Sequence, residues 1–301
     1  MSWDPRALPS QAGTTVVVTG AGRGVGYFVA EQLAAAGARV IVTTRGDTAV
    51  LDSIRSRVPD AQLELVQLEL GSLDSVRAAA ASLSALGPID VLINNAGKTG
   101  GSRQRETTDD GLEIMVGTNA YGPFALTALL LPSVTGRVVS LGSLSTRLAK
   151  ADLADLEQNS GGYNISKAYA SSKHGVHAFA FELDRRLRAS GSGVRSLLAH
   201  PGFALDANSA ARPGINDRGS AGQRFGERLL RPVAHGKDRG AWPVVRAAID
   251  PDAHGGEFYG PSRSVTGPPA LTTPAPQSAD PAFGAAFWDL AEKATGVKFE
   301  V

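Results

Sequence analysis

The sequence predicts one α/β domain built on a doubly wound parallel sheet with helices on both faces. Short runs rich in Val, Ile and Leu alternate with stretches whose apolar residues recur at helical spacing. The passages between successive runs are long enough for helical crossovers, which connect parallel strands. The first run ends at a cluster of glycines, and no internal repeat is visible. We therefore expect residues 1–301 to form a single domain.

Strands and helices alternate along most of the chain. Strands are predicted at residues 14–19, 40–44, 63–68, 89–93, 137–141 and 194–199, with a last strand at 258–259. Helices are predicted at residues 25–36, 48–57, 72–86, 112–131, 163–189, 240–249 and 281–295. The first helix has Val25, Phe28, Val29 and Leu33 on one apolar face, and Gly37 closes it as a C-terminal cap.

Three segments fall outside this alternation. Residues 150–162 form a polar insertion before the long helix. Residues 203–222 are rich in loop-forming residues, and because ligands bind beyond the carboxyl ends of such strands, this segment is a candidate substrate lid. Residues 261–301 are predicted as an extended tail with a short helix, since 261–281 are rich in Pro, Thr and Ser.

Composition excludes several classes of protein. The net charge is +1, so the chain lacks the basic surplus of a nucleic-acid or anionic-membrane binder. It has no cysteine, which removes disulfides and thiolate chemistry and favours the cytosol. Residues 1–11 lack a signal-peptide core, and the longest apolar stretch, 124–134, is interrupted by Pro132 and falls short of the ~20 residues of a membrane span. We expect a cytoplasmic protein with no nucleic-acid partner, no membrane partner and no metal site.

The glycine cluster after the first strand is typical of a Rossmann-like phosphate-binding turn. Gly20, Gly24 and Gly26 allow a tight turn, a close backbone approach to a ligand, and close packing of the next helix on the sheet. The N-terminus of that helix would present free N–H groups to a dinucleotide pyrophosphate. An ordinary strand-to-helix turn can carry the same glycines, but the position between a strand and an amphipathic helix favours the phosphate site.

Tyr169 and Lys173 carry a second signal. Because they are four residues apart, they share one face of the helix predicted at 163–189. A cationic amine beside a phenol favours the phenolate, so a tyrosine that ordinarily titrates near ~10 is expected to exchange protons nearer neutrality. Together with a dinucleotide site, this pair predicts hydride chemistry with proton transfer through the tyrosine.

Further motifs stand in order along the chain: Thr19 to Gly26 (T-G-x-x-x-G-x-G), Asn94 to Gly97 (N-N-A-G), Asn119, Ser143, Tyr169 with Lys173, and Pro201 with Gly202. In this order and spacing they resemble the short-chain dehydrogenase/reductase family in its single-domain form. The resemblance runs from about residue 14 to 202, and more loosely to 260. The polar insertion and the segment His200-Pro201-Gly202 resemble the retinol-dehydrogenase-like branch of that family.

A second pair, Tyr163 and Lys167, has the same four-residue spacing. The two tyrosines are six residues apart, so at ~100° per residue only one of them can face a cofactor. Three small residues separate Tyr169 from Lys173, which resembles the family more closely and favours that pair. The alternative for Tyr163 and Lys167 is a solvated helix start.

The resemblance implies catalytic roles for four residues. Tyr169 would be the general acid in reduction and the general base in oxidation, and Lys173 would lower its pKa and hydrogen-bond the nicotinamide ribose. Ser143 would orient the substrate oxygen and stabilise its developing charge, and Asn119 would hold a water that links Lys173 to solvent. The structural alternatives are a turn-satisfying hydroxyl for Ser143 and a capping or helix-kink asparagine for Asn119.

The resemblance also implies a nicotinamide dinucleotide cofactor. Arg45 follows the second strand and Arg23 lies in the glycine turn, where arginine pairs with the 2′-phosphate of NADP(H) and an acid would favour NAD(H). We therefore expect NADP(H). The implied cofactor residues are Gly20, Arg23, Gly24, Val25, Gly26, Arg45, Glu69, Leu70, Asn95, Ala96, Gly97, Tyr169, Lys173, Pro201 and Gly202. The family often has a threonine after Pro-Gly at the nicotinamide end, and this chain runs from Phe203 to Asp206 there without one.

The predicted function is NAD(P)-dependent hydride transfer on a small-molecule alcohol or carbonyl substrate, by an NADP-preferring alcohol dehydrogenase or carbonyl reductase. A non-catalytic dinucleotide sensor would be expected to lose the tyrosine or the lysine. An extended-type nucleotide-sugar epimerase needs a larger C-terminal domain than the roughly 100 residues after Gly202. The mixed residues of 203–222 select no substrate. The resemblance implies a homo-oligomer formed through the helices at 112–131 and 163–189.

Overall fold

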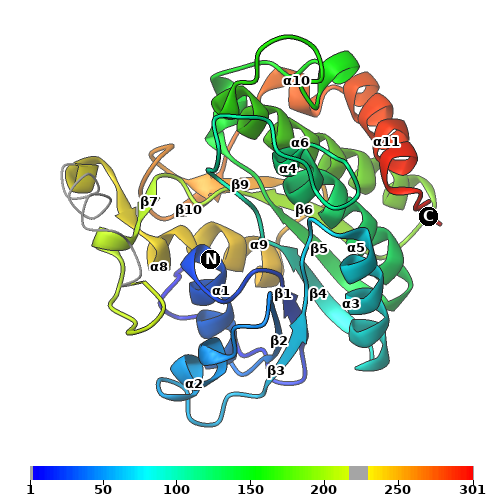
Figure 1. The fold of residues 1–301 in the computed structure, drawn as a ribbon. Coiled ribbons are helices and arrows are strands. Elements are labelled where there is room, and N and C mark those ends of the chain that lie inside the picture. Colours follow the sequence, from blue (N-terminus) through cyan, green and yellow to red (C-terminus); the bar gives the residue numbers. More distant parts are fainter. Residues whose placement is uncertain (1–2, 217–229, 301) are drawn as a thin grey trace.

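The computed structural model describes residues 3–216 and 230–300, and a central sheet organises them (Figure 1). Its strands are β1 (Thr15–Val18), β2 (Arg39–Thr44), β3 (Leu63–Gln67), β4 (Ile89–Asn94), β5 (Val134–Leu141), β6 (Arg195–Ala199), β9 (Phe258–Pro261) and β10 (Pro269–Leu271). Their order is β10-β9-β6-β5-β4-β1-β2-β3, parallel throughout except for the β9–β10 pair. The order reverses direction between β1 and β4. The predicted doubly wound Rossmann-like sheet is therefore confirmed.

Helices cover both faces of this sheet. They are α1 (Gly24–Ala35), α2 (Ala49–Arg55), α3 (Leu73–Ala85), α4 (Ile114–Val116), α5 (Gly122–Leu130), α6 (Ile165–Ala189), α8 (Lys237–Gly240), α9 (Trp242–Ile249), α10 (Pro276–Ala279) and α11 (Pro281–Thr295). Two buried apolar clusters correspond to the two faces: one joins the sheet to α3, α5, α6 and α11, and the other joins it to α1, α2 and α9 (Figure 1). A short second sheet pairs β7 (Ala204–Leu205) with β8 (His235–Gly236).

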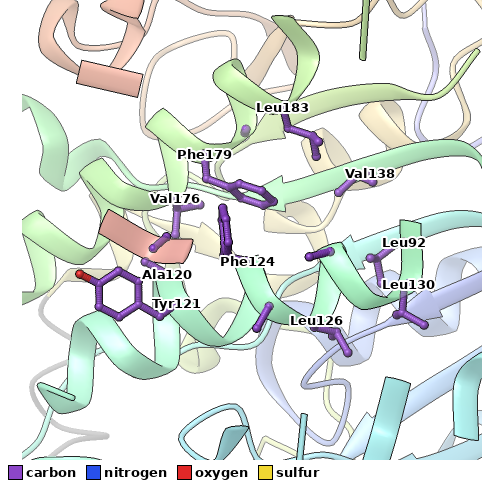
Figure 2. Close-up of a cluster of buried hydrophobic side chains, with 14 of the residues drawn as sticks. Leu92, Ala120, Tyr121, Phe124, Leu126, Leu130, Val138, Val176, Phe179 and Leu183 are labelled. Atoms are coloured by element: carbon purple, nitrogen blue, oxygen red, sulfur yellow. The ribbon is translucent and has the colours of Figure 1, made fainter. Parts of the chain in front are cut away.

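Aromatic packing fixes the helices on the first face. Figure 2 shows Phe124 of α5 against Phe179 of α6, with Leu92 and Val138 of the sheet to one side of them. The centroids of the two rings are 5.4 Å apart, in an edge-to-face arrangement. This contact helps to fix the position of α6, which carries Tyr169 and Lys173, relative to the sheet.

The helix predicted at 112–131 is interrupted by a π-helical turn, Gly117–Tyr121, between α4 and α5. The helical stretch Ile114–Ser133 is long and apolar enough by length and composition to cross a membrane, and its most apolar window has a mean hydropathy of 1.4. The expectation that no stretch reaches that length is therefore wrong. However, 83% of its most apolar window is buried inside the protein, as in a core helix.

The C-terminal segment is more ordered than the predicted extended tail. The chain turns back after β9, and β10 adds an antiparallel edge strand, where a proline such as Pro269 is tolerated. The short helix predicted at 281–295 is confirmed as α11, which packs along α6. Trp288 of α11 is 1% exposed, and its ring centroid lies 5.1 Å from that of Phe124.

Candidate active site

The glycine turn and the N-N-A-G segment fit into each other at the carboxyl ends of β1 and β4. The amide of Asn95 donates to the carbonyl of Thr19 at 2.8 Å, and the hydroxyl of Thr19 accepts from the backbone N–H of Asn95 at 3.0 Å. A Cβ on Gly20 would stand 2.8 Å from Ala96, and one on Gly26 would collide with the Asn95 amide. Glycine is therefore required at both positions by packing, and the turn is fixed in shape before any ligand arrives.

This turn suits the pyrophosphate of a dinucleotide. Arg23 is the N-cap residue of α1, its side chain makes no capping hydrogen bond, and the first turn has no acidic residue. The free N–H groups of α1 are therefore available to an anion. Among the described residues Arg23 is exposed and has no ion pair, and Gly24 has a φ of +69°, which favours glycine.

The residues expected near the adenosine lie together. Arg45 follows β2 directly, and its guanidinium stands 3.5 Å from the carboxylate of Glu69, which follows β3. The Arg45 side chain is 72% exposed, so the pair is open to solvent. Leu70 is 5% exposed, and its side chain packs in the apolar core beneath the loop that follows β3.

Tyr169, Lys173 and Ser143 converge where β5 ends against α6. Lys173 is 4% exposed, and its ammonium donates to the Leu141 carbonyl at 2.7 Å, which ties α6 to the end of β5. It lies 6.0 Å from the centroid of the Tyr169 ring. A Cβ on Gly97 would be 3.8 Å from the Lys173 ammonium, so the N-N-A-G segment reaches the same spot.

Burial is the main cause of the pKa shifts of Tyr169 and Lys173. It raises the pKa of Tyr169, and a side-chain hydrogen bond with Ser143 opposes that only in part. Burial also lowers the pKa of Lys173 to about 8. The expectation that Lys173 brings Tyr169 toward neutrality is therefore not met in this structure, because the ammonium is directed to Leu141 and the phenol is shielded from water.

Asn119 lies in the π-helical turn and braces two other elements. Its carboxamide oxygen accepts from the backbone N–H of Lys98 at 2.6 Å, and its NH₂ donates to the Lys98 carbonyl and to the Ser172 hydroxyl, both at 2.9 Å. These contacts connect the loop after β4 to α6 beside Lys173. The side chain is thus committed to protein partners, and the water-holding role stays a prediction. Single π turns recur at functional sites.

Tyr163 is held away from this group. It precedes α6, and its hydroxyl donates to the buried carboxylate of Glu113 at 2.9 Å. Glu113 in turn caps α4 by accepting from Met115 and Val116. Tyr163 therefore fixes the start of α6 through a hydrogen bond to a buried carboxylate. It is not the solvated residue that the alternative interpretation expected. Lys167 stands exposed at the first turn.

His177 supports Ser143 and was not found from the sequence. It lies on α6 one turn beyond Lys173, and its Nε2 accepts from the backbone N–H of Ser143 at 3.1 Å. Its side chain is fully buried, and burial holds its pKa well below the ordinary value, so the ring is neutral with the proton on Nδ1. Gly142 leaves the space for the ring, since a Cβ there would collide with it. The only sequence signal was its place four residues after Lys173 on the same helix face.

The described part of the candidate lid contacts α1 and the turn between β9 and β10. Arg212 forms a double hydrogen bond with Glu31 of α1, at 2.6 Å for each contact. The backbone N–H of Phe203 donates to the Val265 carbonyl, in the turn between β9 and β10. Residues 217–222 of the predicted lid lie outside the described residues. The described part of the segment is therefore held against the middle of α1.

The glycine turn lies at the switch point of the sheet. Beside it, a tyrosine and a lysine of α6 meet a serine at the end of β5. This fold and this site together define a nicotinamide-dependent oxidoreductase. The chain belongs to the short chain dehydrogenase family, whose model matches residues 14–212. It transfers a hydride between a nicotinamide cofactor and an alcohol or carbonyl substrate.

Named relatives agree with the retinol-dehydrogenase-like branch. The chain is 36% identical to polyprenol dehydrogenase of Mus musculus over 83% of its own length and 76% of that protein. It is 38% identical to retinol dehydrogenase 13 of Homo sapiens over 66% of its own length and 62% of that protein. The crystal structure of a protein from Mycobacterium paratuberculosis has 35% identity and a TM-score of 0.82, and the match covers 100% of both chains.

Proposed function

We propose that this enzyme is an NADP-preferring alcohol dehydrogenase or carbonyl reductase. Arg45 is the observation that carries the proposal. It stands at the carboxyl end of β2 with 72% of its side chain exposed, and Arg23 lies unpaired in the neighbouring turn among the described residues. A guanidinium binds a phosphate through two parallel hydrogen bonds, whereas the ribose hydroxyl of NAD(H) needs an acceptor.

The proposed substrate is an apolar alcohol or the corresponding aldehyde or ketone. Two named relatives act on polyprenol and retinol, both apolar alcohols. In this chain Leu148, five residues after Ser143, is 87% exposed, and Val265, on the turn that contacts Phe203, is 39% exposed. One of these side chains follows the proposed catalytic serine in the chain and the other lies on the turn that contacts Phe203, and we propose that an apolar substrate covers them.

Four residues form the proposed catalytic group. When bound, the cofactor supplies or accepts the hydride. Tyr169 gives the proton to the carbonyl oxygen in reduction and takes it from the hydroxyl in oxidation. Ser143 donates a hydrogen bond to the same oxygen, Lys173 holds positive charge beside the phenol, and Asn119 keeps Lys98 and Ser172 in place around them.

Arg45→Asp should raise the dissociation constant of NADPH by about 10- to 100-fold, the loss of a charged hydrogen-bonded pair of 1.5–3 kcal/mol. NADH binding should change little, because aspartate offers the ribose an acceptor. Fluorescence titration of both cofactors measures this. Arg55→Asp, which makes the same charge change at the far end of α2, is the control. Equal weakening of both cofactors by Arg45→Asp would remove Arg45 as the discriminating residue, and a wild-type preference for NADH would refute the NADP proposal.

His177→Leu should lower kcat by about 10- to 100-fold with a smaller change in KM, because the Ser143 N–H loses its acceptor and the hydroxyl moves off its position. His177→Gln keeps an acceptor and should recover most of the loss. Steady-state kinetics together with thermal unfolding of both variants separates positioning from stability. If Gln and Leu are equally impaired at equal stability, the Ser143 contact does not set the rate.

A further inference from the structure

Lys237 brings a positive charge to the first residue of α1. A Cβ built on Gly24 would lie 4.0 Å from the Lys237 ammonium. Gly24 ends the glycine turn and begins the helix whose N–H groups are free. The lysine comes from a segment more than 200 residues later in the sequence, so no motif in the glycine turn announces it.

Hydrogen bonds from several elements fix the position of Lys237. It follows β8, which pairs with β7 directly after Pro201 and Gly202. The His235 ring is hydrogen-bonded to the Pro201 carbonyl at 2.7 Å, and the backbone N–H of Lys237 donates to the Ser209 hydroxyl at 2.8 Å. On the other side, Gln32 of α1 donates to the Asp238 carbonyl at 2.8 Å. These contacts hold the start of α8 against α1.

Several charged groups surround Lys237. The Lys237 ammonium donates to Asp206 at 2.6 Å, and the two side chains are 24% and 27% exposed. Asp206 is the carboxylate paired with Lys237, and Asp238 in the first turn of α8 is a second carboxylate nearby. The positive groups are Lys237, the N-terminal end of the α1 dipole and its N-cap residue Arg23. A lysine beside a helix N-terminus is repelled by it, and an anion bound between them removes the repulsion. The Oδ1 atom of Asp206 is buried without a hydrogen-bond partner, so the carboxylate faces Lys237 on one side only.

We propose that Lys237 binds the pyrophosphate of the dinucleotide cofactor and that Asp206 positions its ammonium. This contact rests on dinucleotide binding by the family and not on the NADP preference, because NADP(H) and NAD(H) share the pyrophosphate. Lys237 and Arg45 therefore affect different parts of the same ligand.

The test compares ligands that do and do not contain the pyrophosphate. Lys237→Met keeps the apolar stem and should weaken NADPH, NADH and ADP-ribose by a similar factor of about 10, while adenosine 2′-monophosphate binds as to the wild type. The NADPH/NADH affinity ratio should not change. Calorimetric titration measures each dissociation constant without turnover. Arg239→Met removes an exposed charge from the same helix, where the guanidinium lies over the Trp242 ring, and should change none of them.

Lys237→Arg should bind ADP-ribose within about threefold of the wild type, since a cation is kept. Thermal unfolding of each variant confirms that it is folded. Unchanged ADP-ribose binding in folded Lys237→Met overturns the proposal, and so does a loss confined to NADPH, which would place the lysine at the 2′-phosphate. A wild-type preference for NADH would refute the NADP proposal and leave the pyrophosphate result standing.

Discussion

Tyr169→Phe should reduce kcat by about 10³-fold or more while the dissociation constant of the cofactor stays within a few-fold of the wild type. The change removes one hydroxyl, which is the proposed proton donor and acceptor, and proton transfer of this kind contributes about 10²–10⁴-fold. The ring and its packing beside Lys173 are kept. Steady-state kinetics with an apolar alcohol, together with a cofactor titration, measures the two quantities separately.

Tyr163→Phe is the matched control. It removes the hydrogen bond to Glu113, so it should lower the free energy of unfolding by about 1 kcal/mol and leave kcat nearly unchanged. An inactive Tyr163→Phe beside an active Tyr169→Phe would show that the wrong tyrosine faces the cofactor. Both variants inactive at wild-type stability would mean that the two tyrosines act together.

Lys173→Met should stabilise the folded protein while it removes activity. Burial lowers the pKa of Lys173 from 10.5 to about 8, and this difference costs about 3 kcal/mol at pH 7. Methionine carries no charge to bury, although it loses the hydrogen bond to Leu141, worth about 1 kcal/mol. We expect a net gain of about 2 kcal/mol in denaturant unfolding at pH 7. A lower stability would contradict the burial cost.

The same residue gives a pH dependence with a definite sign. Below pH 8 the lysine is protonated in both the folded and the unfolded state, and the full cost applies. Between about 8 and 10.5 the unfolded chain binds more protons than the folded one, so this group makes stability rise with pH. The difference in unfolding free energy between wild type and Lys173→Met should therefore shrink across that window.

The residues recoverable from the sequence are those held by local spacing. The four-residue step from Tyr169 to Lys173 and the glycines after β1 are properties of one helix and one turn, so a single stretch of sequence reveals them. His177 and Lys237 gain their roles from contacts with Ser143 and with Gly24, which lie far away along the chain. No local sequence pattern encodes contacts between residues so far apart in the chain.

The misjudged features have the same origin. The pKa of Tyr169 depends on how much water the fold removes, and spacing on a helix carries no information about that. The strand β10 is three residues long and begins with Pro269, so neither its composition nor its length predicts a strand. Its pairing with β9 exists because the chain turns back after Pro261.

The C-terminal helix α11 packs on the catalytic helix α6 within a single chain. Every residue of α6 from Ala170 to Asp184 is buried within the one chain, partly beneath α11. The homo-oligomer stays a prediction. The support that a neighbouring subunit could give to the catalytic helix comes from the protein's own polypeptide. We therefore expect the geometry around Lys173 to be the same at nanomolar as at millimolar protein concentration.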